Sequence, residues 1–212
     1  MSNGVFIAFE GGDGAGKSGQ VAALVAAYET AGARVLSTRQ PGGTPLGRAI
    51  RDLVLHGDHV SPRAEALLFA ADKAHHVDQV IRPALEDGQV VITDRYTDSS
   101  VAYQGAGRSL GTDEVLRLQL WAVDDLVPDL TVLLDVSPEE GRRRRGAVHD
   151  RLESERDAFH SAVRTHYLAL AAADAGRYLV LDGTLSPSTL QALVLDRLRA
   201  AGLFPRDEAA SS

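Results

Sequence analysis

Hydrophobic residues along this chain occur in short runs separated by longer stretches of mixed polar and apolar sequence. Each run holds four or five residues, rich in Val, Ile and Leu, which is typical of strands buried on both faces of a parallel sheet. The runs lie at 5–9, 35–38, 90–93, 130–134 and 178–181. We therefore expect five strands.

Between these runs, apolar residues recur every three or four positions, which predicts amphipathic helices. We expect helices over 62–85 and 152–173, one from Pro138 into the arginines 142–145, and a last helix after Pro187. Strands that alternate with helices indicate an α/β fold: a five-stranded parallel sheet with helices on both faces. We expect a single domain over 1–204 and a disordered tail over 205–212.

Composition removes several classes of function. The 212 residues include no cysteine, which excludes disulfides, thiolate metal sites and cysteine nucleophiles. No apolar run is long enough to cross a bilayer and the N-terminus lacks a signal-peptide pattern, so we expect a cytoplasmic protein that does not bind membranes. A net charge of −7 argues against a nucleic-acid partner, which would favour a basic face.

The strongest motif follows the first predicted strand. Residues 11–18 read Gly-Gly-Asp-Gly-Ala-Gly-Lys-Ser and match the complete phosphate-binding pattern G-x-x-x-x-G-K-[ST]. Backbone N–H groups of such a loop surround phosphate oxygens, Lys17 reaches the β- and γ-phosphates, and the hydroxyl of Ser18 holds Mg²⁺. The only asparagine is Asn3, so the chain lacks the Asn-Lys-x-Asp segment that reads guanine. We expect an ATP-using kinase or ATPase.

Charged residues follow two other predicted strands. Asp94 and Arg95 come directly after 90–93, and Arg39 comes after 35–38. Because parallel strands present their carboxyl ends at one edge, these groups are expected near Lys17, where they would bind phosphates and Mg²⁺. A surface ion pair is the alternative for Asp94 and Arg95. The arginines 142–145 predict either a solvated face or a lid that brings positive charge to the transferred phosphoryl group.

With these pieces in place, the sequence resembles the thymidylate kinase family in its bacterial form. The matching segments are 10–18, 39–44, 68–73, 94–96, 102–105 and 150–153. The resemblance implies the P-loop nucleoside monophosphate kinase fold and transfer of the γ-phosphoryl group of ATP to dTMP, forming dTDP for dTTP synthesis. It also implies a magnesium ion and a homodimer.

The resemblance assigns roles to individual residues. Lys17, Arg95, Arg145 and Arg151 would be catalytic. The ATP phosphates would contact Gly11, Asp13, Gly14, Ala15, Gly16, Lys17, Ser18, Gly19 and Arg144, and the ion would bind Ser18 and Asp94. The acceptor dTMP would contact Asp13, Arg39, Phe69, Lys73, Arg95, Ser100, Tyr103 and Gln104.

Within that last group, Phe69 would stack on thymine, Ser100 and Gln104 would read one base edge, and Tyr103 would exclude ribonucleotides. Simple core packing is the alternative for Phe69 and Tyr103. Because Gly14 leaves the loop without a basic residue, the resemblance places the catalytic arginine in a lid over about 142–152.

Three positions depart from the family pattern. Lys73 replaces an arginine, Gln40 a glutamate and Gly19 a hydroxyl residue. Lys73 loses the two-pronged contact that a guanidinium makes, which weakens base selectivity. Two other functions stay open: a P-loop kinase for a different nucleotide or nucleoside, and a non-catalytic module that only binds nucleotide.

Overall fold

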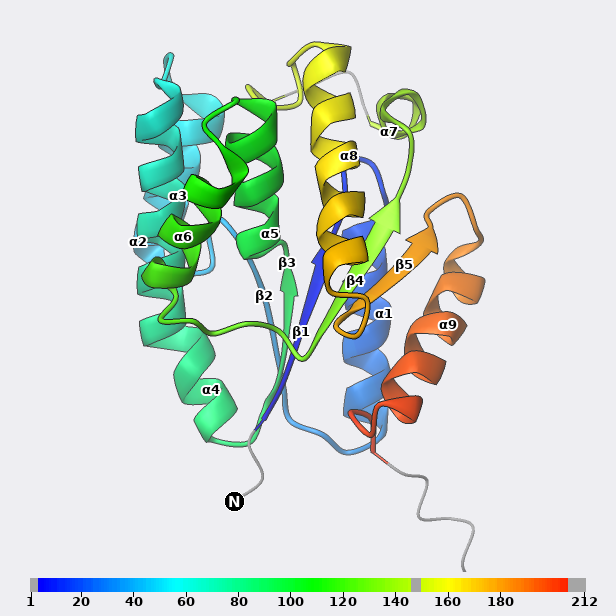
Figure 1. The fold of residues 1–212 in the computed structure, drawn as a ribbon. Coiled ribbons are helices and arrows are strands. Elements are labelled where there is room, and N and C mark those ends of the chain that lie inside the picture. The colour runs from blue at the N-terminus through cyan, green and yellow to red at the C-terminus, as the bar shows by residue number, and fades with distance from the viewer. Residues whose placement is uncertain (1–3, 146–149, 206–212) are drawn as a thin grey trace, which may run out of the picture.

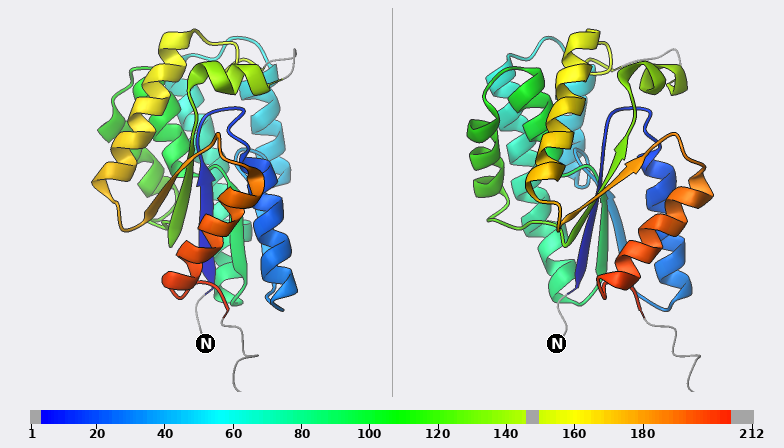
Figure 2. Two further views of the ribbon diagram at one scale, coloured as in Figure 1. Left: turned by 90° about the vertical axis from the view of Figure 1, so that its right-hand side faces the viewer. Right: turned by 45° about the vertical axis from the view of Figure 1, so that its right-hand side comes forward.

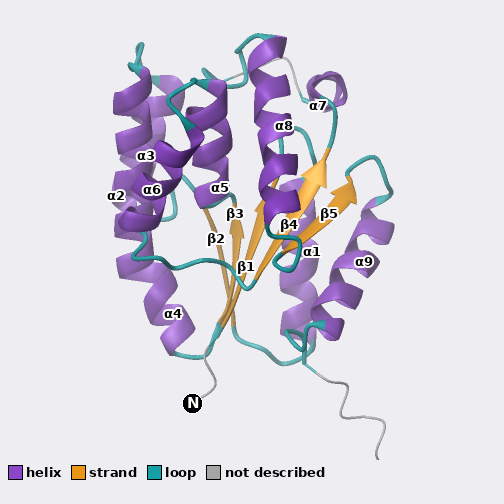
Figure 3. Ribbon diagram, in the orientation of Figure 1, coloured by secondary structure: helices purple, strands orange, loops and turns teal. Residues whose placement is uncertain are grey.

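The computed structural model describes residues 4–145 and 150–205. Its centre is a five-stranded parallel sheet with the strand order β2-β3-β1-β4-β5, and all strands point the same way (Figures 1 and 3). The strands are β1 (Val5–Glu10), β2 (Val35–Arg39), β3 (Val90–Asp94), β4 (Leu130–Asp135) and β5 (Tyr178–Asp182). The predicted α/β fold with five parallel strands is confirmed.

Every strand ends one residue later than its apolar run, and in every case the extra residue is charged. These residues are Glu10, Arg39, Asp94, Asp135 and Asp182. Since all strands run in parallel, the five side chains start from one edge of the sheet. The apolar runs therefore form the body of the sheet, and a charged residue stands at the carboxyl end of each strand.

The two faces of the sheet are covered by different layers (Figure 2). On one face, Ile7 and Phe9 of β1 pack in a cluster with residues of α1 (Lys17–Thr30) and α9 (Pro187–Ala200). On the other face, Phe6 and Ala8 pack against the segment that ends in α4 (Arg82–Glu86). The alternation follows from the two-residue period of a strand, so one strand contributes to both layers.

Further helices surround the site. In chain order these are α2 (Pro45–Arg51), α3 (Pro62–His76), α5 (Thr97–Ser100), α6 (Thr112–Ala122), α7 (Pro138–Arg144) and α8 (Asp157–Ala173). Three π-helical segments continue helices of this group: Asp52–His56, Val77–Ile81 and Val101–Gly107. Helix α8 packs on the segment Val101–Gly107 and on β4 and β5.

Two predicted helices differ in detail. The stretch predicted at 62–85 is helical from Pro62 to Glu86, but its middle turn is π-helical. The helix predicted from 152 begins instead at Asp157. The side chain of Asp150 accepts hydrogen bonds from the backbone N–H groups of Leu152 and Glu153, both at 2.9 Å, and closes a separate turn ahead of the helix.

Part of the predicted lid, 146–149, lies outside the described residues, as does the predicted tail beyond 205. Among the described residues, none of the helices has the length and apolar character needed to span a bilayer.

Candidate active site

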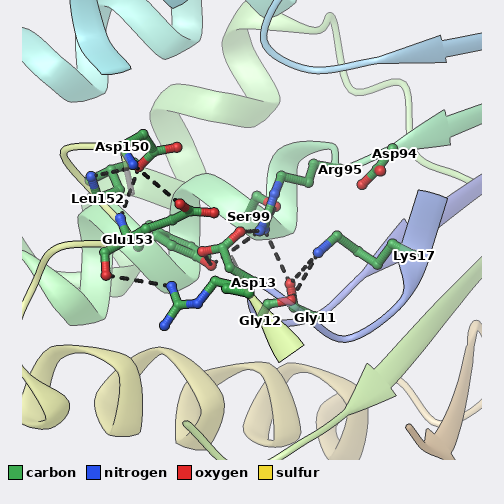
Figure 4. Close-up of polar contacts among 12 residues, drawn as sticks. Gly11, Gly12, Asp13, Lys17, Asp94, Arg95, Ser99, Asp150, Leu152 and Glu153 are labelled. Carbon is green, nitrogen blue, oxygen red and sulfur yellow. Dashed lines mark hydrogen bonds and ion pairs between the residues drawn. The ribbon is translucent and has the colours of Figure 1, made fainter. Parts of the chain in front are cut away.

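The loop Gly11–Ser18 joins β1 to α1 at the carboxyl edge of the sheet. The Nζ atom of Lys17 turns back over this loop and donates to the carbonyl oxygens of Gly11 and Gly12, at 3.0 and 2.9 Å (Figure 4). Because α1 begins at Lys17, its first N–H groups and the positive end of its dipole also face the loop. Backbone donors and an ammonium group thus surround one space, which suits an anion.

Lys17 is nearly fully buried, and burial disfavours its charged form. Burial, aided by the nearby positive charge of Arg95, lowers the pKa of Lys17 to about 8, against the opposing effect of Asp13. The ammonium therefore lacks enough negative charge from the protein to balance it. A triphosphate would supply that charge.

Next to the loop, Ser18 and Asp94 come together although they are 76 residues apart in sequence. The hydroxyl of Ser18 donates to Oδ2 of Asp94 at 2.8 Å, and Ser18 is exposed to the cleft. Hydroxyl and carboxylate oxygens are the ligands that Mg²⁺ prefers. Among residues 4–145 and 150–205 there is no group of three or more His, Asp or Glu able to hold a metal. This pair fits an ion that takes its other ligands from phosphates and water.

Arg95 occupies an unusual backbone position directly after β3. Its φ angle is 69°, in the left-handed region that few residues other than glycine adopt. Its guanidinium forms an ion pair with Asp13 and donates to Gly11 O, to Ser99 Oγ and to the hydroxyls of Tyr103 and Tyr167 (Figure 4). Such a backbone conformation is retained only when its surroundings hold it, as they do here.

Asp13 is held in the loop by Arg95 and by the hydroxyl of Tyr103, which donates to its Oδ2 at 2.8 Å. Burial alone would raise the pKa of Asp13, but the charges of Arg95 and Lys17 outweigh it and hold the pKa well below its usual range. Asp13 is therefore ionised near neutral pH, and its carboxylate only accepts hydrogen bonds.

Glu10, the last residue of β1, is completely buried, and sequence reasoning assigned it no role. Its carboxylate accepts from the backbone N–H groups of Tyr96 and Ser99 and from the hydroxyls of Ser99 and Tyr167. Burial and the charge of Asp98 raise its pKa. Glu10 thereby ties the start of α5 to β1 and α8, and so fixes the strand end that carries Arg95.

A cavity of about 130 Å³ lies beside the loop, between α3, the segment Val101–Gly107 and the turn at 150–153. It brings together residues that the sequence placed in the acceptor site. Asp13, Phe69, Lys73, Arg95, Ser100, Tyr103 and Gln104 all line it. Arg39 does not: it is exposed and lines the wider, open cleft of about 570 Å³ at the loop.

Lys73 is the one lysine inside this cavity and is 2% exposed. Its Nζ atom donates to Ser100 Oγ at 2.8 Å and lies 5.4 Å from the centre of the Phe69 ring. Burial lowers the pKa of Lys73 to about 8. The cavity therefore offers one aromatic face and one strong donor, held close together by α3.

The cavity and the open cleft meet at four residues that line both: Asp13, Gln40, Arg51 and Arg95. Sequence reasoning missed Arg51, at the end of α2. Its guanidinium donates to Pro41 O at 3.2 Å, and burial together with the charge of Arg39 lowers its pKa. No local pattern singles out Arg51, because Arg48 lies one helical turn earlier in the same helix and is exposed.

The arginines of the predicted lid have different surroundings. Arg142 pairs with Asp157 and Arg143 with Glu140, and both are exposed. Arg144 donates to Gly183 O at 2.7 Å and lines the open cleft together with Lys17. Of these three arginines, only Arg144 lines the open cleft, and Arg144 is the one predicted to contact ATP.

Arg145 and Arg151 lie elsewhere. Arg145 donates to the carbonyl oxygen of Glu153 at 3.4 Å and lines a small cavity behind the loop, beside His160. Arg151 forms an ion pair with Glu65 and donates to Val54 O at 2.8 Å. In this structure, neither guanidinium lines the open cleft or the narrower cavity, so the catalytic role of both residues stays a prediction.

Gly14, which leaves the loop without a basic side chain, has a φ angle of 81°. A Cβ atom added at Gly14 would lie 2.4 Å from the carbonyl oxygen of Gly141 in α7, and one added at Gly141 would lie 2.5 Å from Asp13 O. These distances are too short for any side chain. The loop and α7 are packed backbone against backbone at this point.

Comparison with known proteins identifies the family of this chain. The family model described as thymidylate kinase matches residues 9–194. The chain belongs to the thymidylate kinase family. It is 53% identical to a thymidylate kinase of Clavibacter michiganensis subsp. michiganensis, over 93% of this chain and 95% of that protein.

Similar relatives are a thymidylate kinase of Leifsonia xyli subsp. xyli, 54% identical over 92% of this chain and 94% of the relative, and one of Thermomicrobium roseum, 50% identical over 87% and 90%. The family resemblance drawn from the sequence is thereby confirmed. Thymidylate kinases phosphorylate dTMP with ATP, so the predicted enzyme class and activity are confirmed as those of the family.

Proposed function

We propose that this chain transfers the γ-phosphoryl group of ATP to the 5′-phosphate of dTMP, with ATP in the open cleft and dTMP in the narrower cavity. The observation that carries this assignment is the contact between the two spaces. They share Asp13, Gln40, Arg51 and Arg95, so the ends of a donor and an acceptor would meet there. A phosphoryl group passes directly between reactants only when they are held this close.

On the donor side, the loop backbone and Lys17 would hold the β- and γ-phosphates. Lys17 already donates to two loop carbonyl oxygens and would exchange these for phosphate oxygens. Arg144 lines the same cleft and adds a second positive charge from α7. A magnesium ion held by Ser18 and Asp94 would neutralise phosphate charge.

On the acceptor side, Phe69 would stack on thymine and Lys73 would donate to a base carbonyl oxygen. Arg95 and Arg51 would hold the 5′-phosphate at the boundary, with Arg39 at its open side. The second pKa of a phosphate monoester is about 6, so the acceptor is mostly dianionic at neutral pH and needs no general base. The protein's task is to bring two anions together, which arginines do by position and charge.

We propose also that the enzyme is a homodimer. Leu67 of α3 and Trp121 of α6 are 58% and 81% exposed, and the two helices pack against each other on one side of the molecule (Figure 1). Exposed large apolar groups on neighbouring helices fit a protein interface. Sedimentation analysis of the wild-type chain and of Trp121→Asp tests this: a monomeric wild-type protein would contradict the proposal.

The deciding experiment is an acceptor panel with ATP and Mg²⁺: dTMP, dCMP, dGMP and dAMP, with thymidine added to test for a nucleoside kinase. We expect kcat/KM for dTMP to exceed the other values by at least about 10²-fold, because a site that pairs with base polar groups rejects a base that leaves them unpaired. Equal rates with dTMP and dCMP, or phosphorylation of thymidine, would contradict the assignment.

A further inference from the structure

The carboxylate of Glu65, on α3, is completely buried and has no role in the site described so far. Three side chains from other parts of the chain donate to it. Gln104 Nε2 donates to Oε1 at 2.8 Å, Arg108 Nε donates to the same atom at 3.2 Å, and Arg151 forms an ion pair with Oε2. Of these three donors, Gln104 is the one that lines the acceptor cavity.

The two arginines supply the positive charge that a buried carboxylate requires. Arg108 reaches both oxygens of Glu65 and also pairs with Glu155. Arg151 uses its Nε to donate to Val54 O. Each oxygen of Glu65 thus faces a guanidinium, and a carboxylate accepts hydrogen bonds without donating any.

This has a consequence for Gln104. A side-chain amide has a donating NH₂ end and an accepting oxygen, and only the NH₂ end can face a carboxylate. The Oε1 atom of Gln104 is therefore turned away from Glu65. Among the described residues no donor contacts that oxygen, and it is not among the buried polar atoms that lack a partner. It is left as an acceptor for whatever enters the cavity.

The pyrimidines differ in what they would present there. Thymine carries a hydrogen on N3 and a carbonyl at C4, whereas cytosine has a bare N3 and an amino group at C4. An acceptor from Gln104 and a donor from Lys73 match the thymine pattern at both positions. Against cytosine, the same pair would set acceptor against acceptor and donor against donor, which leaves buried polar groups unpaired.

We propose that Glu65 is a positioning residue that fixes the Gln104 amide with its oxygen toward the base, and so makes the site select a pyrimidine carrying a hydrogen on N3 over cytosine. Arg108 and Arg151 contribute to this positioning, because they hold the carboxylate of Glu65 in place. The inference rests on the proposed placement of dTMP in this cavity, and its test is chosen to separate the two.

The test is Glu65→Gln, which keeps the size of the side chain but gives it a donor as well as an acceptor. The Gln104 amide is then free to turn over. We expect the ratio of kcat/KM for dTMP to that for dCMP to fall at least tenfold, mainly through a higher KM for dTMP, with a smaller change in kcat. Glu155→Gln is the matched control. It removes the negative charge of the second carboxylate that pairs with Arg108 and leaves the contact between Glu65 and Gln104 unchanged, so the ratio should stay that of the wild type.

A second variant, Gln104→Leu, removes the acceptor itself. It should lower the ratio of kcat/KM for dTMP to that for dCMP by a similar factor. In a Gln104→Leu background, adding Glu65→Gln should change the ratio no further. If Glu65→Gln is folded and lowers activity equally for both acceptors, Glu65 is only structural and the proposal is wrong. If Glu65→Gln does not fold, an unchanged ratio in Gln104→Leu overturns it. A wild-type enzyme without preference for dTMP would contradict the proposed function instead.

Discussion

The donor cleft and the acceptor cavity adjoin but are built in different ways. The cleft is the wider space, and the loop at 11–18 lines it together with side chains from other elements, among them Arg39, Asp94 and Arg144. The cavity is narrower and is lined by side chains from α2, α3, α5, the segment Val101–Gly107 and the turn at 150–153. In the proposed assignment, one contiguous motif supplies the main groups that hold the β- and γ-phosphates, whereas the groups that read the base come from several elements.

The difference matches the two ligands. Every nucleoside triphosphate presents the same phosphate chain, so a loop of N–H groups suffices to bind it. The acceptor site must discriminate between bases, which requires hydrogen-bond donors and acceptors whose directions are fixed by further residues. Lys73 is held by Ser100 and Gln104 by Glu65, whereas Arg39 in the cleft is exposed.

The strongest test of this division is Lys17→Ala. Because the variant removes the ammonium that stabilises the transferred phosphoryl group, we expect kcat to fall by about 10³-fold. The dissociation constant of dTMP, measured by calorimetry without ATP, should change by less than about threefold. Circular dichroism should show an intact fold. Residual activity within tenfold of wild type would contradict the role of Lys17.

The metal side of the cleft is tested by Asp94→Asn. We expect about a 10²-fold lower kcat and a several-fold higher Mg²⁺ concentration at half-maximal rate, since the ion loses an anionic ligand. Asp182→Asn is the matched control: it is also a strand-end aspartate, but it binds Thr184 and does not line the cleft. An Asp94→Asn enzyme with the Mg²⁺ dependence of wild type would exclude Asp94 from the metal site.

The boundary between the two regions is tested by Arg51→Ala. Since Arg51 lines both spaces, we expect kcat/KM for dTMP to fall roughly 10- to 100-fold, the range for losing one charge-assisted contact. Arg48→Ala, on an exposed position of the same helix, should behave like wild type. Equal behaviour of the two variants would place Arg51 outside the site.

The smallest effect is a pH shift in the cavity. The pKa of Lys73 in the free enzyme is lowered to about 8, so the side chain loses its charge as the pH rises through 8. We expect kcat/KM for dTMP to decline above that pH. Lys73→Arg keeps its charge, so this part of the decline should disappear, while any contribution from Lys17 remains in both enzymes. Identical pH profiles would show that Lys73 does not act as a charged donor.

The sheet could be predicted because its signals are local. Each apolar run is a strand, and only the end of each strand differs, by one residue, from the prediction. The phosphate-binding loop could be predicted equally well, since one contiguous motif carries its chemistry. Arg51 and Glu65 could not be predicted, because they lie on helices among other charged residues. Their positions become special only when α2 and α3 dock beside the loop. The late start of α8 was missed because the Asp150 turn interrupts a sequence that otherwise has helical spacing.

The packing of Gly14 on Gly141 limits how this enzyme can change. An arginine cannot be placed in the loop by substituting Gly14 alone, because any side chain there would collide with the backbone of α7. The helix would have to move first, and Arg144 would move with it. The position of α7 and the residue at position 14 therefore depend on each other. A homologue with arginine at this position of the loop must have α7 at a greater distance from the loop.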